Sequence, residues 1–274
     1  MAVTLADITK LRKMSGAGMM DCKNALEEAS NDFDKAMEII RKKGQAVAAK
    51  RSDREASEGC VLATENGDFA AIVAVKCETD FVAKNSDFIA MTQSFLDAAM
   101  ANKPANSEEL LNTKLSDGRT VENHITDRVG VTGEKMELGF YEFVKDASTI
   151  SYIHPGNKLA TIVAFNKVVD RQVARDIAMQ IAAMNPVAIT SADVPQNVVD
   201  TEMQIARDKA REAGKPENLL DKIAEGALQK FYKENTLLQQ EFVKDSKLTI
   251  EQYLKQQDKE LTVTAFKRVT LNVD

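Results

Sequence analysis

Two stretches of the chain repeat one pattern: an apolar strand, a turn, a second apolar strand and then a helix. In the first stretch, apolar runs at 59–64 and 69–75 flank an Asn-Gly pair, which is a strong signal for a β-hairpin. In the second, runs at 149–153 and 159–165 flank His154-Pro155-Gly156-Asn157, another composition typical of a turn. A chain that carries this pattern twice is expected to build two antiparallel hairpins.

The two stretches also resemble each other in detail. Ile72-Val73-Ala74-Val75 matches Ile162-Val163-Ala164-Phe165, about ninety residues further on. The helical segment from Asp87 to Met100 is echoed by the segment from Asp176 to Met184. We therefore expect the α+β fold class, with two related units that each place an antiparallel sheet against a helix.

The repeat fails at the exit of the second strand. The first copy reads Cys77-Glu78-Thr79-Asp80-Phe81-Val82-Ala83-Lys84-Asn85, with Asn85 or Ser86 as the N-cap of the next helix, and the second reads Asn166-Lys167-Val168-Val169-Asp170-Arg171. Two interpretations of the first copy stay open. Asp80 can form a turn while Phe81 packs under the helix, or both can belong to a binding loop on a rigid scaffold. The difference between the copies favours the binding role.

Residues 1–44 predict three short helices around a thin core, and Gly44 is expected to end the third. On the second helix, Met20 and Lys23 fall on the face away from Met19. An outward methionine beside charges is either a contact point or an ordinary exposed apolar residue. Spacing alone does not separate these two interpretations.

The segment that follows is strongly basic. Residues 41–54 hold Arg41, Lys42, Lys43, Lys50, Arg51 and Arg54 against one acid, Asp53. One interpretation is a patch for nucleic acid or an acidic partner. The other, a solvated linker, is favoured because the aromatic residues of nucleic-acid platforms are missing and the net charge of the chain is −6. We expect no direct contact with nucleic acid.

The rest of the chain predicts helices and one late strand. Between the two copies, a helix is expected from Thr120 to Arg128 within polar loops. Small and apolar residues spaced by three and four predict a helical hairpin over 196–235, broken at Gly214-Lys215-Pro216. This hairpin is either part of a core or a protruding arm. A helix near Thr249–Gln257 and an alternating segment from Leu261 to Leu271, which can join the second sheet, close the chain.

The residue types argue against enzyme chemistry. No GxxxxGK[ST] or GxGxxG phosphate loop occurs, and Cys22, Cys60 and Cys77 fall in apolar stretches where they pack as small hydrophobic residues. With 3 cysteines and 2 histidines, neither a disulfide framework nor a metal site is expected. No catalytic residue and no cofactor is predicted. The start of the chain shows no signal pattern and no run of 18 apolar residues occurs, which predicts a cytoplasmic protein without membrane contact.

Three motifs resemble the translation elongation factor Ts family. They are Leu11-Arg12-Lys13-Met14-Ser15-Gly16-Ala17-Gly18-Met19-Met20-Asp21-Cys22-Lys23, Thr79-Asp80-Phe81-Val82-Ala83-Lys84-Asn85 and Tyr152-Ile153-His154. The resemblance covers nearly the whole chain and implies the family's order of parts. These are a three-helix module similar to ubiquitin-associated domains with a basic linker (1–54), a first core subdomain (55–142) and a second core subdomain (143–274), the last with an inserted coiled-coil hairpin at about 196–235.

The resemblance also implies a function, which is guanine-nucleotide exchange on elongation factor Tu, the GTPase that delivers aminoacyl-tRNA, in its GDP-bound and nucleotide-free forms. By matching motif positions, Phe81 would act as a wedge beside the Mg²⁺ of the partner, and Thr79, Asp80 and Val82 would complete that loop. The GTPase domain would be bound by Arg12, Met19, Met20 and Lys23. His154 would bear on the partner's phosphate loop.

A second hypothesis is a binding adapter that uses the N-terminal module and the coiled-coil hairpin without exchange activity. Such an adapter would tolerate the loss of Phe81. The sequence leaves the oligomeric state open, and both a homodimer and a 2:2 complex with the partner are compatible with it. Many family members continue into a C-terminal helix, whereas this chain stops at Asp274, so no contact of that helix is carried over. The segment from Val129 to Glu134 is longer than the usual pattern, and no contact is carried over from it either.

Overall fold

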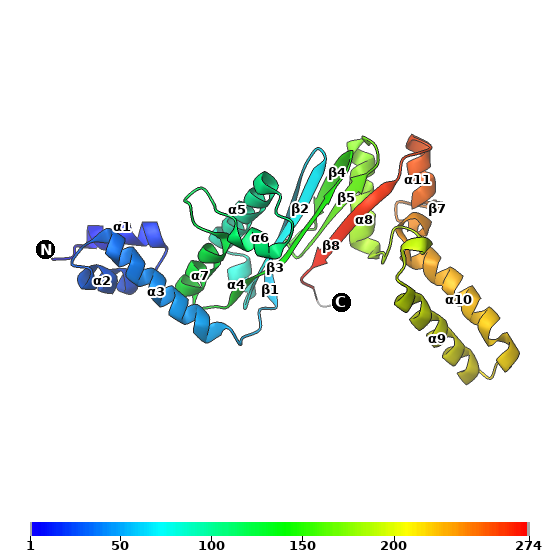
Figure 1. The fold of residues 1–274 in the computed structure, drawn as a ribbon, viewed down its shortest axis with the longest axis horizontal. Helices are drawn as coiled ribbons and strands as arrows, with labels where there is room; N and C mark the ends of the chain where they lie inside the picture. Colours follow the sequence, from blue (N-terminus) through cyan, green and yellow to red (C-terminus); the bar gives the residue numbers. More distant parts are fainter. Residues whose placement is uncertain (1, 273–274) are drawn as a thin grey trace.

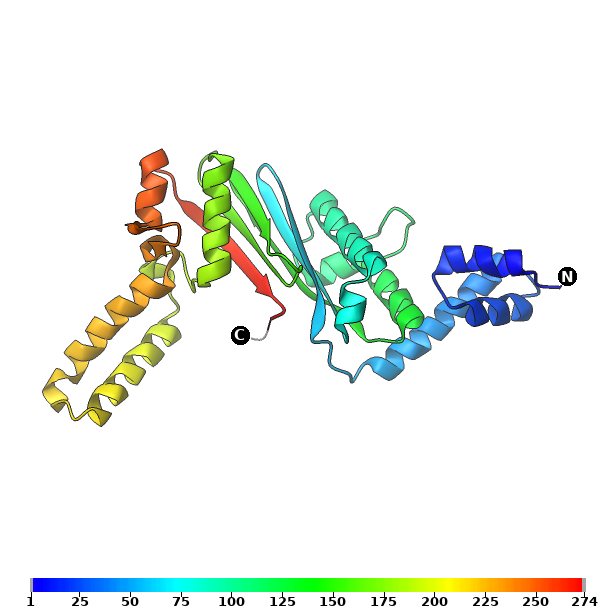
Figure 2. The ribbon, with the colours of Figure 1, turned by 180° about the vertical axis from the view of Figure 1, so that it is seen from behind.

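The computed structural model describes residues 2–272, so Met1, Val273 and Asp274 lie outside the described residues. It shows an elongated molecule with three parts in a row (Figure 1). A small helical module lies at the N-terminal end, a core of strands and helices lies in the middle, and a two-helix hairpin lies at the far end. Figure 2 shows the same arrangement from behind.

The N-terminal module contains three helices, α1 (Leu5–Ser15), α2 (Met19–Glu28) and α3 (Phe33–Arg51). The buried residues of its small core include Leu11, Cys22 and Leu26. The prediction that Gly44 ends the third helix is wrong, because α3 continues to Arg51 and Gly44 is buried inside it. At Gly44 the helix crosses α7 (Val121–Thr132), and the backbone of Gly44 meets that of Gly130. Most of the predicted basic linker is therefore helical.

The first sheet has the order β1-β2-β3, with β1 (Glu58–Asn66), β2 (Phe69–Cys77) and β3 (Met136–Lys145) all antiparallel. The predicted β1–β2 hairpin is confirmed. Strand β3 was not predicted, because only three of its residues, Met136, Tyr141 and Val144, are buried and their spacing does not alternate.

Three helices accompany the first sheet: α5 (Ser86–Asn102), α6 (Ser107–Asn112) and α7. Asn85 is the N-cap of α5, as one of the two predicted alternatives, and its side chain accepts a hydrogen bond from the Asp87 amide. The helix expected from Thr120 to Arg128 exists as α7, but it runs on to Thr132 and stops at Gly133. Gly130 lies within it.

The second sheet has the order β4-β5-β8, with β4 (Ser148–Ile153), β5 (Leu159–Phe165) and β8 (Val263–Thr270). Both the second hairpin and the late strand are confirmed. Helix α8 (Arg171–Met184) packs on this sheet. Short elements complete this part: β6 (Glu241–Phe242), β7 (Asp245–Thr249), α11 (Ile250–Gln257) and the 3-10 helices η1 (Ser191–Asp193) and η3 (Leu237–Gln239).

The two sheets pack against each other, and the helices lie on the outside (Figure 1). The layer between the sheets includes Ala70, Ile72 and Ala74 from β2 and Ala160, Ile162 and Ala164 from β5. The alternate residues of these strands, such as Val73 and Val163, face the helices. Central strands buried on both faces explain the nearly continuous apolar runs in the sequence.

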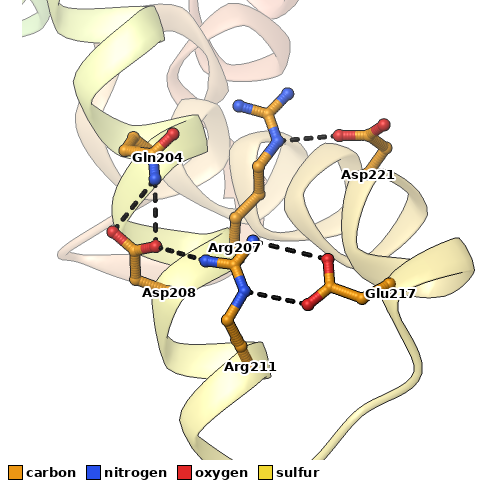
Figure 3. A network of polar contacts seen from close by, with 6 residues as sticks. All are labelled: Gln204, Arg207, Asp208, Arg211, Glu217 and Asp221. Atoms are coloured by element: carbon orange, nitrogen blue, oxygen red, sulfur yellow. Dashed lines mark hydrogen bonds and ion pairs between the residues drawn. The ribbon is translucent and has the colours of Figure 1, made fainter.

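The predicted helical hairpin is confirmed as α9 (Gln196–Glu212) and α10 (Leu220–Asn235), joined through the 3-10 turn η2 (Glu217–Leu219). It projects away from the core in both views (Figures 1 and 2), so it is an arm rather than part of the core. Arg207 pairs with Asp221 between the two helices of this arm, and Arg211 pairs with Asp208 and Glu217 near its tip (Figure 3). Exposed ion pairs each contribute little, but this group ties the tip at several points.

A buried carboxylate joins α8 to the turn between β6 and β7 and to α11, and it gives a testable pH dependence. Burial opposes ionisation of Asp176, but hydrogen bonds from Lys244, Gln172 and Tyr253 hold its pKa below the ordinary value. A lowered folded-state pKa adds stability above the pKa of the unfolded chain, and that stability is lost as the pH falls through the folded-state value.

We expect Asp176→Asn to lower the free energy of unfolding by about 1–3 kcal/mol at pH 7, since it disturbs a charge-assisted hydrogen-bond group. Urea unfolding of wild type and variant from pH 7 to pH 2 measures this. The difference in the free energy of unfolding between wild type and variant should narrow only below about pH 4, where aspartates ordinarily titrate. A gap that stays constant down to pH 2 would show that the carboxylate charge does not contribute.

Candidate functional site

The exit of β2 turns at once into a one-turn helix, α4 (Asp80–Ala83). Thr79 is its N-cap, and the Thr79 hydroxyl oxygen accepts a hydrogen bond from the Val82 amide at 3.4 Å. The Cys77 thiol donates to the Thr79 carbonyl oxygen at 3.3 Å. Threonine followed by a carboxylate is thus a capping signal here, and the expected loop is helical instead.

Phe81 projects from α4 into solvent, with 84% of its surface exposed. Val82 and Ala83, by contrast, pack against the first core. The interpretation in which Phe81 packs under the following helix is therefore wrong. A single exposed apolar residue is common on protein surfaces, but Phe81 is the most exposed aromatic residue among the large apolar side chains of the described chain. A phenyl ring presented on a short, capped helix is a suitable docking group.

Glu134, which sequence reasoning missed, holds α4 in place. Its carboxylate accepts two hydrogen bonds from Thr79, one from the hydroxyl at 2.7 Å and one from the amide at 3.1 Å. Glu134 lies between the end of α7 and the start of β3, 55 positions from Thr79 in the chain. Without β3, no pattern in the sequence could have placed these two residues together.

A second glutamate ties neighbouring segments to the same point. The Glu78 carboxylate accepts the Lys135 amide at 2.6 Å and an Arg54 guanidinium N–H at 2.9 Å. Arg54 follows α3, whereas Lys135 follows Glu134. Hydrogen bonds to Glu78 and Glu134 therefore connect the exit of β2, the end of α7 and the segment that leaves the N-terminal module.

Asp80 faces solvent next to two cations. The hydrogen bond from Lys84, at 2.7 Å, is the main cause that lowers the pKa of Asp80, and the charge of Lys158 adds to it. Lys158 itself pairs with Glu58 at 2.7 Å. Asp80 is therefore ionised at neutral pH and free to exchange its exposed lysine for another polar group.

His154 lies exposed at the tip of the β4–β5 hairpin. Its ring Nδ1 is 3.1 Å from the Tyr152 hydroxyl, and the Asn157 carbonyl of the same tip accepts the Val61 amide of β1 at 2.7 Å. This tip lies toward the end of the core at which β2 passes into α4, because the Gly67 turn at the opposite end of β2 bonds the start of β4. The structure thus brings the Asp80-Phe81 segment and the His154 tip to one end of the core.

The other predicted contact residues, Arg12, Met19, Met20 and Lys23, are all exposed on the N-terminal module. Met20 is 64% exposed, and Met19, which periodicity assigned to the inner face, is 45% exposed because it begins α2. Lys23 pairs with Glu27 at 3.7 Å. Their helices, α1 and α2, lie at the N-terminal end of the molecule, apart from α4 (Figure 1).

Two of the buried thiols, Cys60 and Cys77, are held in the protonated form. Burial raises the pKa of Cys60 to about 11 and that of Cys77 to about 12, so both thiols are protonated at neutral pH. No group of three or more His, Cys, Asp or Glu side chains in residues 2–272 could hold a metal ion, and no helix there is long and apolar enough to cross a membrane.

The Glu134 contact makes a direct prediction. Glu134→Ala leaves the Thr79 hydroxyl and amide without their acceptor, which should cost about 2 kcal/mol and speed local opening of α4 about thirtyfold. Hydrogen–deuterium exchange of residues 77–84 measures this opening. Glu134→Gln keeps one carbonyl acceptor and should recover part of the protection, and Glu225→Ala, on the exposed face of α10, is the control. Unchanged exchange in Glu134→Ala would mean that packing of Val82 and Ala83 alone holds the helix.

Comparisons with known proteins agree on one family. A family model described as Elongation factor TS matches residues 78–272. A protein named Elongation factor Ts from Porphyromonas gingivalis is 74% identical over 274 residues. Proteins of the same name are 57% identical over 275 residues in Azobacteroides pseudotrichonymphae and 49% identical over 331 in Phocaeicola vulgatus. Each of these alignments covers all of this chain and all of the relative.

Proposed function

The chain belongs to the elongation factor Ts family, and from this premise we propose that it is the guanine-nucleotide exchange factor of elongation factor Tu. In this proposal it binds the GTPase in its GDP-bound form, promotes release of GDP and Mg²⁺, and holds the nucleotide-free form until GTP enters. It supplies binding energy and no catalytic group of its own.

The observation that carries the proposal is the exposed Phe81 ring on α4. A wedge must be accessible and must also resist being pushed back into its own protein. Phe81 meets the first requirement with its 84% exposure, and the Glu134–Thr79 hydrogen bonds below it support the second. The ionised Asp80 next to it adds a charge that competes for polar groups around Mg²⁺ in the partner.

The expected mechanism is negative coupling between two ligands of the GTPase. Phosphate is held by backbone N–H groups and a helix N-terminus, and Mg²⁺ requires near-octahedral oxygen coordination. Both depend on accurate placement, so a ring inserted beside them weakens the binding of GDP. Linkage requires that GDP weakens the binding of this chain by the same factor.

Two further contacts complete the proposal. His154, at the same end of the core as Phe81, would press on the phosphate-loop side of the partner. Met19 and Met20, with Arg12 and Lys23 beside them, would hold the GTPase domain from the N-terminal module. Exposed, flexible methionines suit such a contact because they adapt to the partner surface.

The direct test is stopped-flow release of a fluorescent GDP from elongation factor Tu, with and without this protein, at fixed Mg²⁺. Acceleration that saturates with protein concentration supports exchange. Excess Mg²⁺ should reduce the acceleration, because it opposes displacement of the ion. Tight binding to the GTPase without any acceleration would support the adapter hypothesis instead.

A further inference from the structure

The N-terminal module is fastened to the core by an unusually close helix contact. Of its three helices, α3 makes the extensive contact with α7. At the crossing, the Gly44 and Gly130 backbones meet: a Cβ atom added to Gly130 would lie 2.5 Å from the Gly44 Cα. Carbon atoms in normal contact are about 3.5–4.0 Å apart, so the two helices can cross this closely only with glycine at position 130.

The contact is not symmetric. A Cβ atom added to Gly44 would lie 3.5 Å from the Gly130 Cα and 3.6 Å from the Thr126 carbonyl oxygen, which are ordinary van der Waals distances. Alanine therefore fits at position 44 but not at position 130. This difference provides a matched pair of substitutions at a single contact.

The end of α7 that carries Gly130 also fixes the strand exit. Glu134, four residues after Gly130, accepts both hydrogen bonds from Thr79 under the Phe81 helix. The backbone amide of the next residue, Lys135, donates a hydrogen bond to the Glu78 carboxylate. That carboxylate also accepts one from Arg54, which follows α3. Residues 130–135 thus contact the N-terminal module on one side and the Phe81 segment on the other.

We propose that residues 130–135 are a positioning element that sets the N-terminal module relative to Phe81, so that both surfaces reach one partner at the same time. This inference rests on the proposed function, since it assumes that both surfaces bind the same GTPase. Two sites held at a fixed, matching separation raise the effective concentration of the second contact, and a joint that is displaced loses this gain. Gly130 and Glu134 act through Met20 and Phe81 and need not touch the partner.

The test uses Gly130→Ala, with Gly44→Ala and Gly226→Ala as controls. Gly226 lies in α10 with nothing within 4 Å of an added Cβ atom, so it reports the general effect of alanine in a helix. The distance between the N-terminal module and the core is measured by double electron–electron resonance between spin labels attached at Asp34→Cys and Glu108→Cys. The three native cysteines are buried, which favours labelling at the two new exposed sites.

We expect Gly130→Ala to shift or broaden the distance distribution, whereas both controls keep the wild-type distribution. In the fluorescent GDP assay, Gly130→Ala should raise KM about tenfold and leave kcat within about twofold, because the Phe81 segment itself is intact. Gly44→Leu, which adds bulk from the other side of the contact, should reproduce this result and serves if Gly130→Ala does not fold.

An unchanged distance distribution in Gly130→Ala and Gly44→Leu would overturn the proposal, and so would a changed distribution with wild-type KM. A wild-type protein that binds the GTPase without accelerating release is a different outcome, because it rejects the proposed exchange activity. In that case the positioning element is judged on the dissociation constant, which should rise about tenfold in Gly130→Ala.

Discussion

Replacing Phe81 with alanine is expected to slow GDP release from elongation factor Tu at least about thirtyfold at saturating protein. Truncating a residue that inserts fully into a partner pocket typically costs about 2 kcal/mol or more of binding free energy, and every 1.4 kcal/mol corresponds to a factor of ten. Fold stability should change little, because the ring is 84% exposed and makes few contacts within its own chain. The measurement is stopped-flow release of fluorescent GDP, combined with the dissociation constant for the nucleotide-free GTPase.

A second exposed aromatic residue provides the control. Phe140 of β3 is 41% exposed and lies on a different part of the first sheet, so Phe140→Ala should exchange nucleotide like the wild type. Phe81→Ala should still bind, since the N-terminal module and the His154 tip are unchanged. Equal acceleration by Phe81→Ala and wild type would reject the wedge and place the exchange activity elsewhere on the protein. Binding without exchange by all three proteins would support the adapter.

The parts of the fold that could be predicted are those whose signals are local. The Asn-Gly turn and the apolar runs around it define β1 and β2, because turn residues and strand periodicity act within about ten positions. The helical hairpin was equally visible, since Gly214 and Pro216 interrupt two regular patterns of small residues. The difference between the two repeated units at Phe81 was also visible, because it needs only a comparison of two short stretches of sequence.

The parts that could not be predicted depend on partners far away in the chain. Strand β3 has few fully buried residues because it lies at the edge of the sheet, where half of its residues are partly accessible, so its sequence does not alternate. Glu134 matters only through Thr79, 55 positions away. Gly44 resembled a helix end because glycine often follows the last residue of a helix, but it lies inside α3, where that helix crosses α7 at Gly130.

The largest stability effect is expected from Gly59→Ala in β1. Gly59 pairs with Lys76 of β2, and a Cβ atom there would lie 2.3 Å from the Val75 carbonyl oxygen and 2.9 Å from the Lys76 Cα. These are backbone atoms of the neighbouring strand, so no side-chain rotation can relieve the overlap. The Leu271 side chain, at 2.9 Å, closes the same space from the end of the second sheet.

Separating β1 from β2 at this position should cost about 3 kcal/mol or more, because overpacking of a well-packed site costs 1–3 kcal/mol and here the backbone itself must move. For a domain of this size, such a loss lowers the melting temperature by roughly 6–12 °C. Gly67→Ala is the matched control, because its φ of 63° disfavours alanine but its surroundings are open, and it should lose only about 1–2 kcal/mol. Because Gly59 also has a positive φ, of 156°, calorimetric unfolding of the two variants shows how much the steric overlap at Gly59 adds to the conformational cost. Equal losses would mean that the sheet yields at Gly59. A much larger loss in Gly59→Ala would show that β1 and β2, the strand pair that leads to the Phe81 helix, cannot separate where they pack against the second sheet. The proposed wedge needs such rigidity, because the Phe81 ring must keep its position when it meets the partner.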